Sequence, residues 1–503
     1  MTTPSHSPRG ADEPSSPPPG CPAHGLGPGG LRRLYGPEAD ADLAGIYEKL
    51  RAEHGSVAPV LVHDDVPIWA VIGHTEVLHM LRTRTHFTRD SRRLRVVQDG
   101  TFRPDNPLAP MVTWAPLISF ADGAEHQRVR GAINDALAAI DDRGLRRFIH
   151  RSSQRLVNEF CETGTADLVS QFAEHLPMAV MCEVLGMPDE YNERLVQAGR
   201  DMTKGSETAV ASNEYVMEVL NRHTARRRAD PKEDFTSRLL THPAQLADDE
   251  VAQNLRVVLI AAHEGTANLM ANVLRMVLTD PRFRAQLNGG QMTVPEAIEQ
   301  SLWDEPPMSA QLAYAAIQDA ELGGKQIKAG DALMYVSSAG NLDPVVRPDP
   351  KASMAGNRAH LAFGGGAHEC PGQDIARAIA DIGVDALLMR LPDAELAVDE
   401  KELRWRQTII ARHLVELPVT FTPRPQQDVK LRPTMGGVPA PRSEWEVSTP
   451  APAQRSLATV PAQASAEDRS EQRLAPIPAA PPAGDEEPPR GALQRLLRWW
   501  RGY

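Results

Sequence analysis

The chain has 503 residues, of which 41% are hydrophobic and 24% are charged, values typical of a globular protein. Its formal net charge of −12 argues against nucleic acid as the main partner and favours small molecules or other proteins. The 4 cysteines form no C-x-x-C pair, which excludes a zinc ribbon or a secreted disulfide framework and predicts a cytoplasmic location. No secretory signal and no unbroken run of about 18 apolar residues occurs, so the sequence predicts a soluble protein.

The composition divides the chain into three parts. Residues 1–30 are rich in Pro, Gly and Ser and carry almost no large apolar side chains, so we expect a disordered arm there. Residues 31–424 have the patterns of a folded domain. Residues 425–503 return to Pro, Ala, Ser and charge and are expected to be a disordered tail. The tail ends in RGALQRLLRWWRGY, a short basic amphipathic segment that docks on a membrane or a partner protein, or else is an inert solvated end.

The folded part is predicted to be mainly α with small β-sheets, an α+β fold. Apolar residues recur at three- and four-residue spacing in four helical segments, 125–139, 166–186, 248–279 and 373–391. Shorter segments favour strands, at 66–72, 325–337 and 408–422.

The helix predicted over 248–279 is the longest of these. Asp248 and Asp249 are plausible capping residues, and Asp280 followed by Pro281 ends the pattern. At 1.5 Å per residue, a helix of about 30 residues spans roughly 45 Å. We therefore expect it to cross the whole domain.

A glycine-rich loop precedes the last predicted helix. It reads FGGGAHECPG from Phe363 to Gly372, and the helical run QDIARAIADIGVDALL follows it directly. Consecutive glycines allow tight turns and a close approach to a flat ligand, and the amino end of a helix favours a thiolate over a thiol. Such a thiolate suits an axial iron ligand, although a lone Cys is more often a small buried apolar residue.

This loop resembles the cytochrome P-450 signature F-G-x-G-x-H-x-C-x-G at every fixed position, and the resemblance extends over roughly residues 31–424. The matching residues are Phe363, Gly364, Gly366, His368, Cys370 and Gly372. The resemblance implies the cytochrome P-450 fold, in which haem b lies between a long distal helix and the Cys-loop helix. It also implies that Cys370 is the axial ligand and that Phe363, Gly364, His368 and Gly372 contact the cofactor.

Further haem contacts are implied elsewhere. The segment ADGAEHQRVRGAIND resembles the helix of the family whose His and Arg bind haem propionates, here His126 and Arg130. Their i,i+4 spacing places both on one helix face, although such a pair taken alone is usually a solvated surface feature. Tyr314 stands where many relatives have a third propionate-binding Arg. A phenol donates one hydrogen bond but brings no charge.

The distal helix departs from the family pattern A-G-x-E/D-T-T. Aligned on LIAAHEGTANLM at 259–270, Ala262 is a cofactor contact and Glu264 keeps the acid, but Gly265 replaces the Thr that assists dioxygen activation. Thr266 follows, rotated by about 100° around the helix. The resemblance makes Glu264, Gly265 and Thr266 the candidate catalytic residues. Whether Gly265 provides space or a kink stays open at this point.

A second departure lies at 295–307, in PEAIEQSLWDEPP. The E-x-x-R pair of the family is replaced by Gln300 and Trp303, and the Arg that completes this network is replaced by Ala352. We expect all three charges to be gone together, since replacing a whole ionic set can be nearly neutral. Trp303 would then fill the space, with its indole N–H bonded to a neighbour such as Gln300. The EQSLW run resembles an actinobacterial subset that lacks the pair.

The resemblance implies a haem-thiolate monooxygenase that uses dioxygen to hydroxylate or otherwise oxidise an apolar small molecule. Electrons would come from ferredoxin and ferredoxin reductase. Two alternatives remain open: a haem-thiolate enzyme that uses peroxide, suggested by Gly265, and a non-catalytic haem-binding regulatory or interaction protein, suggested by the two ends of the chain.

Overall fold

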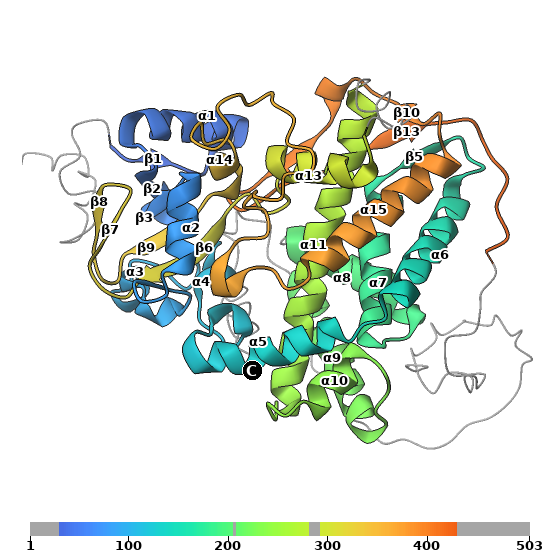
Figure 1. Cartoon of the computed structure of the whole chain (residues 1–503), viewed down its shortest axis with the longest axis horizontal. Helices are drawn as coiled ribbons and strands as arrows, with labels where there is room; N and C mark the ends of the chain where they lie inside the picture. Colours follow the sequence, from blue (N-terminus) through green and yellow to red (C-terminus); the bar gives the residue numbers. More distant parts are fainter. Residues whose placement is uncertain (1–29, 205–207, 281–291, 430–503) are drawn as a thin grey trace, which may run out of the picture. The chain divides into compact units, whose positions relative to one another are not determined.

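The computed structural model describes residues 30–204, 208–280 and 292–429, and these lie within one compact unit. A helical body carries small sheets (Figure 1), which confirms the predicted fold class. The amphipathic end of the tail and residues 1–29 of the predicted arm lie outside the described residues.

Helices make up most of the described chain. The longer ones are α1 (Pro37–His54), α2 (His74–Arg82), α5 (Gly123–Ala138), α6 (Asp142–Phe160), α7 (His175–Leu185), α8 (Asn192–Lys204), α9 (Ala209–Ala229), α10 (Phe235–Thr241), α11 (Asp248–Thr279), α13 (Val294–Asp304) and α15 (Gln373–Arg390). Short helices are α3 (Arg95–Gln98), α4 (Ala109–Val112) and α14 (Ser337–Asn341). α5, α11 and α15 begin and end within about two residues of the predicted segments.

The largest sheet has six strands in the order β1-β2-β3-β9-β6-β4, and the others have three or two. The strands of the large sheet are β1 (Arg32–Arg33), β2 (Val57–Val62), β3 (Val66–Val71), β9 (Ala332–Tyr335), β6 (Gln311–Ala316) and β4 (Phe87–Thr88). The three-stranded sheet joins β10 (Glu395–Leu396), β13 (Pro418–Thr420) and β5 (Thr165–Asp167). The two hairpins are β7 (Ala320–Leu322) with β8 (Lys325–Ile327), and β11 (Trp405–Gln407) with β12 (Arg412–Leu414).

The helix α11 runs through the centre of the body and packs against α7, α9, α13 and α15 (Figure 1). It is long and apolar enough to cross a membrane by length and composition, but 61% of its most apolar window is buried inside the protein, as in a core helix. Its first turn holds Asp248 and Asp249, so the prediction that they cap the helix is wrong. The Glu250 carboxylate accepts the N–H of Ala247 instead, at 2.9 Å.

Three predicted segments are divided in the structure, and the strand predicted over 408–422 becomes β12 and β13. The helix predicted over 166–186 is wrong at its start, because β5 pairs with β13 through Ala166 and Val419 and a π-helical turn follows before α7. The strand predicted over 325–337 is two strands, β8 and β9. The turn between them contains Gly330 with φ +85, a conformation that favours glycine.

Candidate active site

The Cys370 loop folds back on itself between β9 and α15. A Cβ at Gly366, where φ is +66, would lie 2.2 Å from the carbonyl oxygen of Leu81, so only glycine fits. The N–H of Cys370 donates to the carbonyl oxygen of Phe363 at 2.9 Å, which closes the loop. α15 begins at Gln373. The thiol therefore lies just before the amino end of α15, as the sequence predicts.

The surroundings of Cys370 act on its thiol in opposite directions. Burial raises the pKa of Cys370, while the N–H of Gly372 and the charge of Arg130 lower it by less. Without a bound metal ion, the net shift of the Cys370 pKa is upward, toward the neutral thiol. A metal cation bound at the sulfur deprotonates a thiol outright. We therefore expect Cys370 to be a thiolate when its sulfur binds a metal cation.

The helix α11 presents an open face at the predicted distal segment. It is helical throughout from Asp248 to Thr279, so Gly265 does not kink it. A Cβ at Gly265 would meet no atom within 4 Å, and Ala261 is exposed although it lies in the central helix. Thr266 is only 3% exposed. Gly265 therefore opens space beside the helix, while the Thr266 side chain packs in the interior.

Glu264 faces a small cavity of about 50 Å³ that Arg406 and His413 also line. Its Oε1 lies 3.5 Å from Nε2 of His413. Burial raises the pKa of Glu264, and the charge of Arg406 opposes this shift. Burial also lowers the pKa of His413 to about 4, helped by Arg406. At neutral pH His413 is uncharged, so of these two neighbours of Glu264 only Arg406 brings a positive charge.

His126 and His368, both predicted as cofactor contacts, lie together with their ring centroids 4.2 Å apart. Nε2 of His368 lies 3.1 Å from Oδ1 of Asp122. Nε2 of His126 is buried without a hydrogen-bond partner among the described residues, and burial together with the charges of His368 and Arg130 lowers its pKa to about 4. A buried polar nitrogen normally has a partner, so this atom is suited to a ligand.

Arg130, the third predicted contact, is oriented differently. Its guanidinium donates to Oδ1 of Asn134 at 2.9 Å and to the carbonyl oxygen of Glu369, next to Cys370. Burial lowers the pKa of Arg130. The structure thus brings Arg130 to the Cys370 loop.

These features fit the implied cofactor. Haem b is a flat macrocycle with two propionate carboxylates and an iron that takes an axial ligand. The open face at Gly265 suits the macrocycle, the unpartnered nitrogen of His126 suits a carboxylate, and the thiol of Cys370 suits the iron.

The helix α13 shows what replaces the E-x-x-R pair. Gln300 donates to Oδ2 of Asp304 at 2.9 Å and accepts the N–H of Met354 at 2.7 Å. Trp303 is 1% exposed and fills the core as predicted. Its indole N–H donates to the carbonyl oxygen of Asn357 at 2.8 Å, so the expected bond to Gln300 is wrong. Ala352 contributes only its backbone, whose carbonyl oxygen accepts from Arg347 at 3.4 Å.

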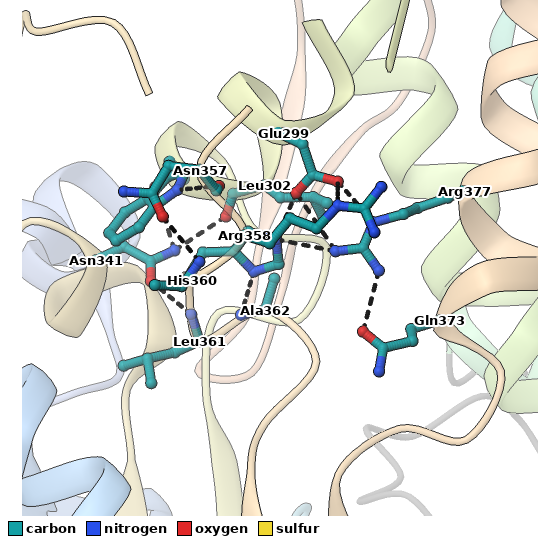
Figure 2. Close-up of polar contacts among 12 residues, drawn as sticks. Glu299, Leu302, Asn341, Asn357, Arg358, His360, Leu361, Ala362, Gln373 and Arg377 are labelled. Carbon is teal, nitrogen blue, oxygen red and sulfur yellow. Dashed lines mark hydrogen bonds and ion pairs between the residues drawn. The ribbon is translucent and has the colours of Figure 1, made fainter. Parts of the chain in front are cut away.

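A charged residue, Glu299, lies one position before Gln300 on the same helix. Figure 2 shows His360 and Arg377 converging on the carboxylate of Glu299. Nε2 of His360 lies 2.9 Å from Oε2, Nε of Arg377 lies 2.6 Å from Oε1, and Arg358 lies 3.5 Å away at the surface. Glu299 is 4% exposed. The three charges of the E-x-x-R network are thus absent at positions 300, 303 and 352, as predicted, and a separate buried ionic cluster surrounds Glu299.

This Glu299 cluster connects to the Cys370 loop. The Arg377 guanidinium lies 4.6 Å from the ring centroid of Phe363, a cation–π contact, and the carbonyl oxygen of Phe363 accepts the N–H of Cys370. Burial alone would raise the pKa of Glu299, but hydrogen bonds from His360 and Arg377 outweigh it and lower the pKa to about 2. No local sequence pattern indicates this cluster, because the partners of Glu299 lie 61 and 78 positions away along the chain.

Comparisons with known proteins identify the family of the chain. No family model matches the chain. Nocardicin C N-oxygenase from Nocardia uniformis is 31% identical over 401 residues, which cover 77% of this chain and 98% of that protein. The 2-hydroxy-5-methyl-1-naphthoate 7-hydroxylase of Streptomyces carzinostaticus is 28% identical over 75% of this chain and 95% of its own length.

Solved structures of cytochromes P-450 also match the chain. CYP154C4 from Streptomyces matches with a TM-score of 0.70 and 28% identity, over 76% of this chain and 96% of that one. The myxobacterial cytochrome P-450 CYP267B1, in complex with myristic acid, matches with a TM-score of 0.68 and 27% identity, over 77% and 98%. The chain therefore belongs to the cytochrome P-450 superfamily of haem-dependent monooxygenases.

Proposed function

We propose that residues 31–424 form a haem-thiolate monooxygenase domain that acts on an apolar small molecule in the cytoplasm and takes electrons from ferredoxin and ferredoxin reductase. The observation that carries this proposal is the Cys370 loop, which a hydrogen bond between Phe363 and Cys370 closes just before the amino end of α15.

The cofactor of the family is haem b, which supplies dioxygen activation at its iron when bound. We propose that Cys370 provides the axial thiolate and that His126, Arg130 and His368 bind or orient the propionates. Phe363, Gly364 and Gly372 of the Cys370 loop shape the proximal side of the haem site in this proposal. Ala262 of α11 and Tyr314 of β6 shape its other sides.

Glu264 is proposed to deliver protons at the distal face. Its raised pKa keeps the carboxyl closer to the protonated state than a surface Glu, as a general acid requires. Gly265 leaves room beside it for water and substrate. Thr266 is buried, so we assign it a structural contribution to the helix rather than a contact with the reacting atoms.

A cavity of about 810 Å³ provides the candidate substrate site. It is bounded by the segment from Trp114 to Ala124, by Val129 of α5 and by Asn254 of α11. Its volume lies in the range of small-molecule sites, about 300 to 1,000 Å³. The apolar side chains of Trp114, Leu117 and Phe120 offer one wall to an apolar substrate, and charged residues that include Arg84, Arg93 and Glu250 line the rest of the cavity.

The electron source is tested without knowledge of the substrate. The purified haem protein is mixed under carbon monoxide with NADPH and ferredoxin reductase, with and without ferredoxin, and the absorption of the reduced, carbon-monoxide-bound form is followed. We expect fast reduction only when ferredoxin is present. Equal reduction without ferredoxin would contradict the proposed donor, and oxygenated product formed with peroxide alone would favour the peroxide-using alternative.

A further inference from the structure

Arg89 is a buried arginine next to the predicted cofactor site. It follows β4, which pairs with β6 through Phe87 with Ala316 and Thr88 with Ala315. Continuing this register places Arg89 opposite Tyr314, where cross-strand side chains share one face. The guanidinium lies 4.7 Å from the Tyr314 ring centroid, and Arg89 is 5% exposed.

The positive charge of Arg89 has no carboxylate partner in the described part of the chain. Its guanidinium donates to the carbonyl oxygens of Ser119 and Leu312, which are neutral. The only group of Arg89 that donates to Asp122 is its backbone N–H, at 2.6 Å. No ion pair to Arg89 occurs among residues 30–204, 208–280 and 292–429. Because buried charges are normally paired, this one is suited to an anion that binds beside it.

The neighbours of Arg89 point to the same region. Asp122 links Arg89 to His368, whose ring contacts His126, and Nε2 of His126 is the buried nitrogen without a partner. Tyr335 lies beside Tyr314, with ring centroids 5.9 Å apart. A buried cation and a buried, unpartnered imidazole nitrogen are therefore both connected to Asp122, directly for Arg89 and through His368 for His126.

We propose that Arg89 binds a haem propionate and supplies, from the end of β4, the cation that Tyr314 does not provide. This inference rests on the proposed haem-thiolate function. A guanidinium matches a carboxylate in geometry and charge, and such charge-assisted hydrogen bonds are stronger than neutral ones.

The test compares haem b with its dimethyl ester, in which both propionates are uncharged. Dissociation of each from the protein is measured by transfer to apomyoglobin, for wild type, Arg89→Gln and Arg92→Gln. Arg92 is the matched control, because it is an exposed arginine paired with Asp90. We expect Arg89→Gln to weaken retention of haem b by about 10- to 100-fold but to change retention of the ester by less than about threefold. Arg92→Gln should change neither.

A double exchange, R89Y with Y314R, keeps the same cross-strand pair in reverse order, and it should restore most of the retention of haem b. Equal weakening of haem b and of its ester in Arg89→Gln would overturn the inference, because it would show a purely structural role. The reduced carbon monoxide spectrum is recorded for every complex. A wild type that binds haem b without a thiolate spectrum would overturn the proposed function. The comparison of haem b with its ester would still test the contact between Arg89 and a propionate.

Discussion

Replacing Glu299 with Gln is expected to lower the free energy of unfolding of the haem-bound protein by about 3 to 5 kcal/mol. Removing the charge of Glu299 leaves Arg377 without its buried counter-charge and weakens the contact with Nε2 of His360. Urea unfolding at pH 7 measures the loss. The same variant should lose part of its thiolate spectrum, because Arg377 also contacts Phe363, which holds the N–H of Cys370.

The pH dependence of this loss has a definite sign. The pKa of Glu299 falls from 4.5 to about 2 on folding, so its stabilisation is fully present above about pH 4.5 and disappears as the pH falls toward 2. The difference between wild type and Glu299→Gln should shrink over that window.

Glu305→Gln is the matched control, since Glu305 follows the same helix and its carboxylate pairs with the partly exposed Arg412 at 3.1 Å. It should cost less than about 1 kcal/mol. A Glu299→Gln protein as stable as this control would contradict the role of the cluster.

Glu264→Gln is expected to lower kcat by about 100-fold or more, because general acid catalysis contributes about 10²- to 10⁴-fold. The amide keeps the size of the side chain but has no proton to transfer at neutral pH. The carbon monoxide spectrum and KM should be unchanged. Turnover is measured with the ferredoxin system as oxygenated product per haem.

Two further variants separate proton transfer from packing in this cavity. Glu264→Asp keeps a carboxyl and should recover part of the activity. Glu174→Gln removes a carboxylate that lines the same cavity but is paired with Arg200, so kcat should change by less than about threefold. Wild-type kcat in Glu264→Gln would exclude Glu264 as the proton donor.

The sequence was most informative where local signals agree. The helix α11 was predicted with its observed bounds because its apolar periodicity is long and Pro281 ends it. The Cys370 loop was predicted because Gly366 and Cys370 occur in a specific motif, and the contact of Gly366 with Leu81 explains the glycine. A helical periodicity, or a glycine that the backbone conformation requires, can thus be recognised in the sequence.

The parts that were missed depend on contacts between distant residues. At position 299 a Glu looks like any helix residue, and only the approach of His360 and Arg377 makes it the centre of an ion cluster. Arg89 belongs to the site only through the pairing of β4 with β6. The start of the predicted helix at 166 was wrong because Ala166 pairs with Val419. Such pairings follow from tertiary structure.

The most direct test of the haem-thiolate assignment is the absorption spectrum of the reduced, carbon-monoxide-bound protein, recorded for wild type and Cys370→Ala. The predicted result is a red-shifted thiolate band in the wild type that is absent from the variant, with both proteins folded by circular dichroism. A wild type without this band, or a Cys370→Ala protein that keeps it, would contradict the assignment of Cys370 as the axial ligand.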